Sequence, residues 1–201
     1  MRILFFGDSI TQGFWDTKGG WVGRLREHFD ALAMQNLQHN TQPEIFNLGV
    51  SGDTTRDLLT RIESETKVRR WENDPLMAVI AIGTNDGSLL DEFKVNLEQI
   101  VAIIRPLTET VVLVGNPACD ETRTTPVFWG DYSYNNQDLE RSEQIIATVA
   151  KEHGLPYVPV FQKFKQELDA GNDLLQDGLH PNAEGHQLIA DLCKPVLEGC
   201  L

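Results

Sequence analysis

Clustered basic residues and long apolar runs are both missing from this sequence of 201 residues. Lysine and arginine number 17 against 30 aspartate and glutamate residues, and the formal net charge is −13. Nucleic acids and anionic membrane surfaces are bound by clustered lysine and arginine, so we expect neither as a partner. No stretch of the sequence approaches the ~20 apolar residues that a membrane-spanning helix needs, and we expect no stable membrane insertion.

Cysteine is also scarce, and the three cysteines are Cys119, Cys193 and Cys200. Their odd number and wide spacing fit neither a disulfide framework nor a zinc site, which predicts free thiols in a reducing compartment. After Met1, only four apolar residues precede a polar turn, too few for the apolar core of a secretory leader. We therefore expect a cytoplasmic location.

The chain does contain a regular alternation of apolar runs and helical patterns. Five short apolar runs predict strands, because each is bounded by polar or glycine-rich turns. These runs lie at residues 3–6, 44–48, 76–82, 111–114 and 157–160. Between the first two runs, Leu25 and Phe29 fall at helical spacing with Leu32, which predicts one apolar helix face.

The alternation of strand and helix continues over the whole chain without a linker or a repeat. It predicts a single domain, residues 1–201, of the α/β class, with a five-stranded parallel sheet between two layers of helices. Right-handed crossovers leave few topologies for such a sheet, and we expect a three-layer, flavodoxin-like α/β/α sandwich.

The turns that follow the first three strands hold side chains suited to chemistry. They read GDSIT at residues 7–11, SGDT at 51–54 and GTND at 83–86. In an open parallel sheet, the carboxyl ends of all strands lie at one edge, where ligands bind. We therefore expect the Ser9 hydroxyl, the Gly52 amide and the Asn85 carboxamide to be neighbours.

A base for Ser9 is available in the segment DGLHP at residues 177–181. A serine hydroxyl is a weak nucleophile until a neighbour takes its proton, and histidine is the usual base near neutral pH. Asp177 lies three residues before His180, so one turn can place the carboxylate against the imidazole and hold its tautomer.

These four segments resemble the four sequence blocks of the GDSL family, also called SGNH hydrolases, and they occur in the family's order. The resemblance implies the SGNH hydrolase fold and a serine esterase or acylhydrolase, without metal or other cofactor, that hydrolyses small-acyl or lipid-type esters. Ser9 would be the nucleophile that carries the acyl group, His180 the base and then acid, and Asp177 its orienting carboxylate. The oxyanion hole would be formed by the Ser9 amide, the Gly52 amide and the Asn85 side chain.

The resemblance leaves the ester open, as well as the choice between hydrolysis and acyl transfer and the oligomeric state. A carbohydrate O-acetyl esterase of the same family is the first alternative. A metal-dependent phosphoesterase is an alternative from another class, and oxygen-rich sites do suit hard cations. Its ligands would be Asp8, Asp53, Asp86, Asp177 and His180. That interpretation leaves Ser9 and Asn85 without a role.

A third alternative is a flavodoxin-like module that binds a flavin or a phosphate at residues 7–11 without catalysis. A module of this kind needs a loop rich in glycine and hydroxyl groups, which residues 7–11 partly provide. It does not need Asp177 or His180, so the presence of both favours the esterase.

Other polar residues near these segments are assigned structural roles. We expect Asp8 and Asp86 to brace their loops by hydrogen bonds, and Asp53, or else Thr54, to cap a helix. The remaining histidines have no partner at useful spacing, and we expect them at the surface. They are His28, His39, His153 and His186.

Residues 118–136 show no regular period, and a stretch of this length is usually functional or mobile. It follows the fourth predicted strand and should lie over the edge that carries the site. Its aromatic residues are Phe128, Trp129, Tyr132 and Tyr134. They can line a substrate pocket or pack the loop onto the last helices, and the sequence leaves both interpretations open.

Overall fold

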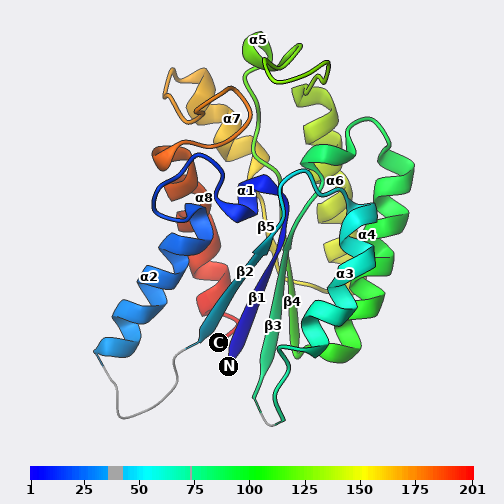
Figure 1. Ribbon diagram of the computed structural model, residues 1–201, viewed down its shortest axis with the longest axis vertical. Helices are drawn as coiled ribbons and strands as arrows, with labels where there is room; N and C mark the ends of the chain where they lie inside the picture. The colour runs from blue at the N-terminus through cyan, green and yellow to red at the C-terminus, as the bar shows by residue number, and fades with distance from the viewer. Residues whose placement is uncertain (36–42, 73) are drawn as a thin grey trace.

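The computed structural model describes residues 1–35, 43–72 and 74–201, in which a five-stranded parallel sheet lies between two layers of helices (Figure 1). The strands are β1 (Arg2–Gly7), β2 (Glu44–Gly49), β3 (Leu76–Ala81), β4 (Thr110–Val114) and β5 (Tyr157–Val158). Their order is β2-β1-β3-β4-β5, which is the flavodoxin-like order. The predicted fold class is confirmed.

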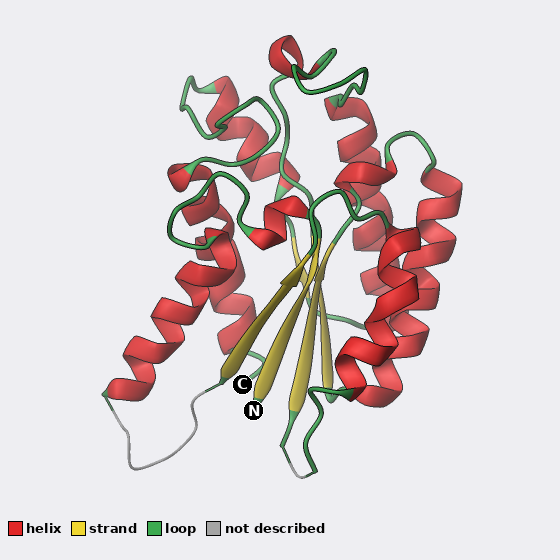
Figure 2. Ribbon diagram, in the orientation of Figure 1, coloured by secondary structure: helices red, strands yellow, loops and turns green. Residues whose placement is uncertain are grey.

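Helices cover both faces of the sheet (Figure 2). One layer contains α2 (Gly20–Met34), α7 (Phe161–Asp169) and α8 (Ala183–Glu198). The other contains α3 (Thr55–Lys67), α4 (Leu90–Ile104) and α6 (Asn136–His153). Successive side chains of a strand point to opposite faces, so Ile3 and Phe5 of β1 pack in the first layer, and Leu4 and Phe6 in the second. Burial of both faces explains the nearly continuous apolar runs of β1, β3 and β4, whereas the edge strand β2 is only partly buried and contains Glu44 and Asn47.

The carboxyl ends of the strands gather at one edge, the upper edge in Figure 1, and both termini lie at the opposite edge. The short helices α1 (Ser9–Gln12) and α5 (Glu121–Thr124) lie at this edge, together with the 3₁₀ helix η2 (Thr84–Asp86) that follows β3. Gly7 of β1 is level with Gly49 of β2 and Ala81 of β3. The turns after these three strands therefore leave the sheet side by side.

Gly7 ends β1 where the chain passes closest to its neighbours. A Cβ atom at this position would lie 2.2 Å from the Ala81 carbonyl oxygen and 2.2 Å from Thr11 Oγ1, far inside van der Waals contact. Only glycine allows β1 to turn directly into α1. This close turn places Ser9 at the first position of a helix, two residues beyond the end of β1.

Several local predictions differ from the structure. Leu32 is exposed, so the apolar face of α2 ends at Phe29. The last strand is only two residues long, because the Val160 amide donates to the Glu143 carboxylate and not to the sheet. The segment 118–136 contains a helical turn, α5. In the described ranges, no helix has the length and apolar character to cross a membrane.

The prediction that the remaining histidines lie at the surface is wrong for His186. This residue of α8 is fully buried, and a Cβ atom at Gly20 of α2 would lie 3.3 Å from its ring. The polar residues around His186 in the sequence predict an exposed side chain. Its burial results from the close packing of α8 against α2, which no local pattern indicates. His28 is half-buried beside Glu198, 2.7 Å away, and His39 lies outside the described residues.

Candidate active site

Ser9, His180 and Asp177 form a continuous line of hydrogen bonds at the carboxyl edge of the sheet. Ser9 Oγ lies 2.9 Å from His180 Nε2, and His180 Nδ1 lies 2.7 Å from Asp177 Oδ2. All three residues are buried. The fold thus joins two residues that are 171 positions apart in the sequence, Ser9 and His180. A hydroxyl, an imidazole and a carboxylate in this order can move a proton away from the hydroxyl.

The loop between α7 and α8 holds Asp177 and His180 by its own backbone. Asp177 Oδ1 accepts hydrogen bonds from the amides of Leu179, at 3.0 Å, and His180, at 2.8 Å. Gly178 has a φ of +96°, which allows the tight turn between them. Burial alone would raise the pKa of Asp177, but the hydrogen bonds from the His180 ring and from the two amides outweigh it and lower the pKa to about 2. Asp177 is therefore a carboxylate at neutral pH.

Aromatic rings surround the His180 imidazole and its carboxylate. The rings of Phe14 and Trp129 have centroids 5.0 Å and 5.6 Å from that of His180. The Trp15 indole donates a hydrogen bond of 2.7 Å to Asp177 Oδ2. Among the described residues, Trp15 is the one non-glycine residue with a positive φ, +66°, which is strained for a bulky side chain. No motif or spacing in the sequence predicts this contact.

A cavity of about 450 Å³ lies beside Asp177. Its lining residues are Trp15, Arg123, Phe128, Gln176 and Asp177. The side chain of Arg123 donates to the carbonyl oxygens of Leu175 and Gln176, which holds the 118–136 segment against the loop that carries Asp177. Of the aromatic residues in that segment, Phe128 lines this cavity and Tyr134 packs against the hydrophobic core.

The turns after β1, β2 and β3 are joined to each other by hydrogen bonds. The Val50 amide donates to the Gly7 carbonyl at 3.0 Å, and the Ser51 amide to the Gln12 side chain at 3.0 Å. Asn85 Nδ2 donates to the Asp53 carbonyl at 3.0 Å. These contacts bring the predicted oxyanion-hole segments into one group around the start of α1.

Gly52 and Ser9 contribute the backbone amides of this group. Gly52 has a φ of +84°, and no heavy atom lies within 4 Å of a Cβ built on it. The glycine is therefore required for its backbone conformation and not for space. The Ser9 amide is at the first position of α1, where no preceding helical carbonyl can accept it. The Ser9 amide is thus suited to bind an anionic oxygen.

Asp8 and Asp86 brace the site, as predicted. Asp8 caps α1 by accepting a hydrogen bond from the Ile10 amide at 2.9 Å. Asp86 accepts from the amide of Thr55 at 3.1 Å and from its hydroxyl. Burial raises the pKa of both carboxyl groups, to about 6 for Asp8.

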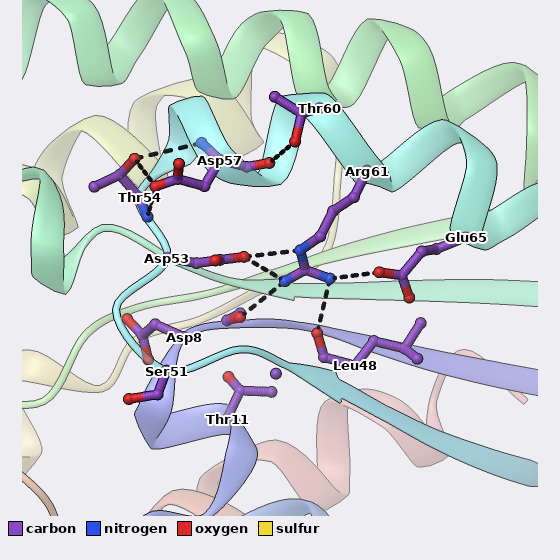
Figure 3. Close-up of polar contacts among 12 residues, drawn as sticks. Asp8, Thr11, Leu48, Ser51, Asp53, Thr54, Asp57, Thr60, Arg61 and Glu65 are labelled. Atoms are coloured by element: carbon purple, nitrogen blue, oxygen red, sulfur yellow. Dashed lines mark hydrogen bonds and ion pairs between the residues drawn. The ribbon is translucent and has the colours of Figure 1, made fainter.

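Of the two residues expected to cap the helix after β2, Thr54 is the cap of α3, in a reciprocal contact with Asp57, and Asp53 is not. Asp53 instead pairs with Arg61, whose Nη2 lies 2.6 Å from Asp53 Oδ2 (Figure 3). The same guanidinium donates to the carbonyl oxygens of Leu48, at 3.0 Å, and Gly7, at 3.2 Å. Arg61 thus fastens the ends of β1 and β2 to α3. Sequence reasoning missed it, since an arginine on a helix is usually solvated.

The acids of the metal alternative have other partners. Asp53 pairs with Arg61, and Asp86 is bonded to Thr55. Within the part of the chain that the structure describes, no group of three or more histidine, cysteine, aspartate or glutamate side chains is placed to hold a metal ion.

Comparisons with known proteins identify the family of this chain. The sequence model of the GDSL-like Lipase/Acylhydrolase family matches residues 5–188. The chain is 28% identical over 210 residues to the isoamyl acetate-hydrolyzing esterase of Saccharomyces cerevisiae, covering 98% of this chain and 86% of that esterase. It is 27% identical over 215 residues to the acetylxylan esterase of Geobacillus stearothermophilus, covering 94% and 90% of the two chains.

A solved structure, the lipase/acylhydrolase from Enterococcus faecalis, has the same fold. Its TM-score is 0.78 at 24% identity, and the superposition covers 100% of this chain and 96% of that one. The family model spans most of the chain, and the sheet order and helix layers agree with those of an SGNH hydrolase. The protein therefore belongs to the GDSL-like lipase/acylhydrolase family and is a carboxylic ester hydrolase.

Proposed function

We propose that the protein hydrolyses its ester through an acyl-enzyme on Ser9, with His180 and Asp177 as the other members of a catalytic triad. The unbroken hydrogen-bond line from Ser9 Oγ to Asp177 Oδ2 carries this proposal. Ser9 Oγ attacks the ester carbonyl while its proton passes to His180 Nε2. The bond to the alcohol then breaks, and His180 returns the proton to the leaving oxygen.

Water completes the reaction in the same geometry. His180 takes a proton from a water molecule, whose oxygen attacks the acyl carbon, and the proton returns to Ser9 as the acid leaves. Asp177 stays ionised throughout and stabilises the imidazolium. No metal or other cofactor takes part in this proposal.

The proposed oxyanion hole consists of the Ser9 amide, the Gly52 amide and Asn85 Nδ2. These donors stabilise the negative oxygen of the tetrahedral intermediate, and each is worth about 3–4 kcal/mol of transition-state stabilisation. The position of the Ser9 amide at the start of α1 supports its role, because no preceding helical carbonyl accepts its N–H there.

We propose acetates and other short-acyl esters as the substrate class. Two relatives support it, since one is named for isoamyl acetate and the other for acetylxylan. We assign the cavity beside Asp177 to the leaving alcohol, because Asp177 is bonded to His180, the group that returns the proton to that alcohol. The exposed rings of Trp15 and Phe128 suit an apolar alcohol.

A carbohydrate acetate is the second candidate. The polar groups of Arg123 and Gln176 line the same cavity, and an aromatic ring beside polar groups also suits a sugar. The acetylxylan esterase relative supports this alternative.

An ester panel varied in two directions tests these proposals. One series fixes p-nitrophenol and lengthens the acyl chain, and we expect the highest kcat/KM for acetate. The other fixes the acetyl group and compares isoamyl acetate with acetylated xylose oligomers. Preference for the xylose series makes the protein a carbohydrate esterase. Wild-type activity in both Ser9→Ala and His180→Ala contradicts the catalytic assignment.

We further propose a single domain in the cytoplasm, with a small-molecule ester as its partner and without nucleic-acid or membrane partners. The free thiols of Cys119 and Cys193, both buried, support a reducing compartment. The family match over residues 5–188 supports one domain. Fractionation of cells that make the protein with an epitope tag tests the location.

A further inference from the structure

Both ends of the Asn85 carboxamide are held by protein groups. Asn85 Nδ2 donates to the Asp53 carbonyl at 3.0 Å, and Asn85 Oδ1 accepts from the Tyr134 hydroxyl at 3.1 Å. A carbonyl oxygen can accept but not donate, so Asp53 determines which end of the amide is nitrogen. The nitrogen has two hydrogens, and one remains for a ligand.

We propose that Tyr134 is a positioning residue of the oxyanion hole, which holds Asn85 Oδ1 so that the second Nδ2–H points at the carbonyl oxygen of the bound ester. This inference rests on the proposed function, because it takes Asn85 as an oxyanion donor. The terminal torsion of asparagine is otherwise broad, and a single contact to Asp53 leaves the amide free to rock. A hydrogen bond to Oδ1 also polarises the amide and strengthens its N–H as a donor.

Tyr134 is itself anchored, although it belongs to the segment without a regular period. Its backbone amide donates to the Thr124 carbonyl at 3.0 Å, and its carbonyl accepts from Thr124 Oγ1 at 2.9 Å. Thr124 is fully buried, and the Tyr134 side chain packs against the hydrophobic core. The neighbouring Tyr132 is 66% exposed. The segment therefore delivers one fixed hydroxyl to the site and leaves its other tyrosine in solvent.

The Tyr134 hydroxyl remains a donor at neutral and mildly basic pH. Burial raises its pKa, and the nearby acidic groups of Asp8, Tyr132 and Asp177 raise it further. The effect of removing this hydroxyl should therefore be the same across the pH range in which the enzyme is assayed.

The test is the variant Tyr134→Phe, which keeps the ring and both backbone contacts. We expect kcat on a p-nitrophenyl acetate substrate to fall about tenfold, with KM within about twofold, because the lost contact acts in the transition state. Binding of a trifluoromethyl ketone, which forms a tetrahedral adduct with the serine, should weaken by about the same factor. Tyr132→Phe is the matched control, and it should retain wild-type kinetics.

A double-mutant cycle with Asn85→Ala separates a positioning role from a structural one. Asn85→Ala should lower kcat by about 10²–10³-fold, and Tyr134→Phe should add no further loss in that background. A full tenfold loss on top of Asn85→Ala, or a loss confined to KM, overturns the proposal. Equal thermal midpoints of Tyr134→Phe and Tyr132→Phe confirm that the fold is intact.

The two single variants test the roles of Asn85 and Tyr134 separately. Wild-type kcat in Asn85→Ala contradicts the assignment of Asn85 to the oxyanion hole. A large loss in Asn85→Ala with wild-type kcat in Tyr134→Phe leaves that assignment intact and overturns the role of Tyr134 alone.

Discussion

The two sides of the proposed active site are held by different parts of the fold. On the oxyanion side, the Gly52 and Asn85 donors depend on contacts between segments from β1, β2, η2 and α3, with the Asp53–Arg61 ion pair at their centre (Figure 3). On the proton-transfer side, Asp177 and His180 share one short turn, and the amides of that turn hold the carboxylate.

This difference has a consequence for mutations. A change far from the chemistry can displace the oxyanion donors, because their positions depend on how the strand ends are fastened to α3. The triad turn carries its own restraints, and its further support comes from aromatic rings around it. Four predictions test this contrast, in order of decreasing effect.

The largest effect is expected from the groups that move protons. His180→Ala should lower kcat by at least about 10⁴-fold, because Ser9 then has no base. Asn85→Ala, on the oxyanion side, should lower it by about 10²–10³-fold. Steady-state kinetics on p-nitrophenyl acetate measures both. Equal losses in the two variants would contradict the assignment of different roles to the two sides.

Removal of Arg61 should damage the oxyanion side and the fold together. Arg61→Ala leaves Asp53 without its cation and removes one donor from each of two backbone carbonyls, those of Leu48 and Gly7, so the free energy of unfolding should fall by about 3–5 kcal/mol. Urea denaturation measures this loss. Arg56→Ala is the matched control on the same helix, since Arg56 forms an exposed pair with Glu92 whose loss should cost under about 1 kcal/mol. A similar loss in both variants would refute the role of Arg61.

On the proton-transfer side, buried His186 should make stability depend on pH. Burial lowers the pKa of His186 to about 4, so the unfolded chain binds its proton at higher pH than the folded protein does. The contribution of neutral His186 to the free energy of unfolding is then fully present above about pH 6.5. It is lost as the pH falls toward 4. Asp8 contributes with the opposite sign, because its raised pKa makes its stability contribution fall as the pH rises from 3.8 to about 6.

The variant His186→Leu isolates this contribution. Between pH 7 and pH 4.5 the wild-type free energy of unfolding should fall by about 2–3 kcal/mol more than that of the variant. Urea unfolding at the two pH values gives the comparison, and the variant's stability at pH 7 cancels out of it. The same pH dependence in both proteins would contradict the buried, neutral state of His186.

The smallest effect is expected from Trp15. Trp15→Phe removes one hydrogen bond to Asp177 and keeps an aromatic wall for the cavity. Three donors to Asp177 remain, so kcat should fall only about three- to fivefold. Trp71→Phe is the control, since Trp71 contacts Arg2 at the start of β1, at the opposite end of the strand from Ser9. A loss of 100-fold or more in Trp15→Phe would show that the triad turn cannot hold Asp177 by itself.

The sequence predicted much of this protein because the signals involved are local. The apolar runs determine the strands, and the polar turns that follow them determine which residues reach the carboxyl edge. The spacing of Asp177 and His180 places both side chains in one turn, whatever the rest of the chain does. Asp8 is also correctly assigned as a brace, because the Ile10 amide that it accepts from is two residues away. Asp86 is a brace as well, but it reaches Thr55, 31 residues away.

Other features depend on side chains that meet across long sequence separations. Arg61 contacts the carbonyl of Gly7, 54 residues away, and Tyr134 contacts Asn85, 49 residues away. Trp15 contacts Asp177 across 162 residues. No spacing or period encodes such contacts, because they depend on loop paths and on the packing of helices against the sheet.

The sequence by itself determined the α/β alternation and which polar turns reach the carboxyl edge, because apolar periodicity and turn chemistry are local. The roles in the proposed catalytic triad and oxyanion hole come from the resemblance of those turns to the sequence blocks of the GDSL family. The tertiary structure decided how the site is held: the pairing of Asp53 with Arg61, the support of Asn85 by Tyr134, and the burial of His186. These depend on where distant side chains come to lie once the helices have packed, and only the folded chain sets those positions.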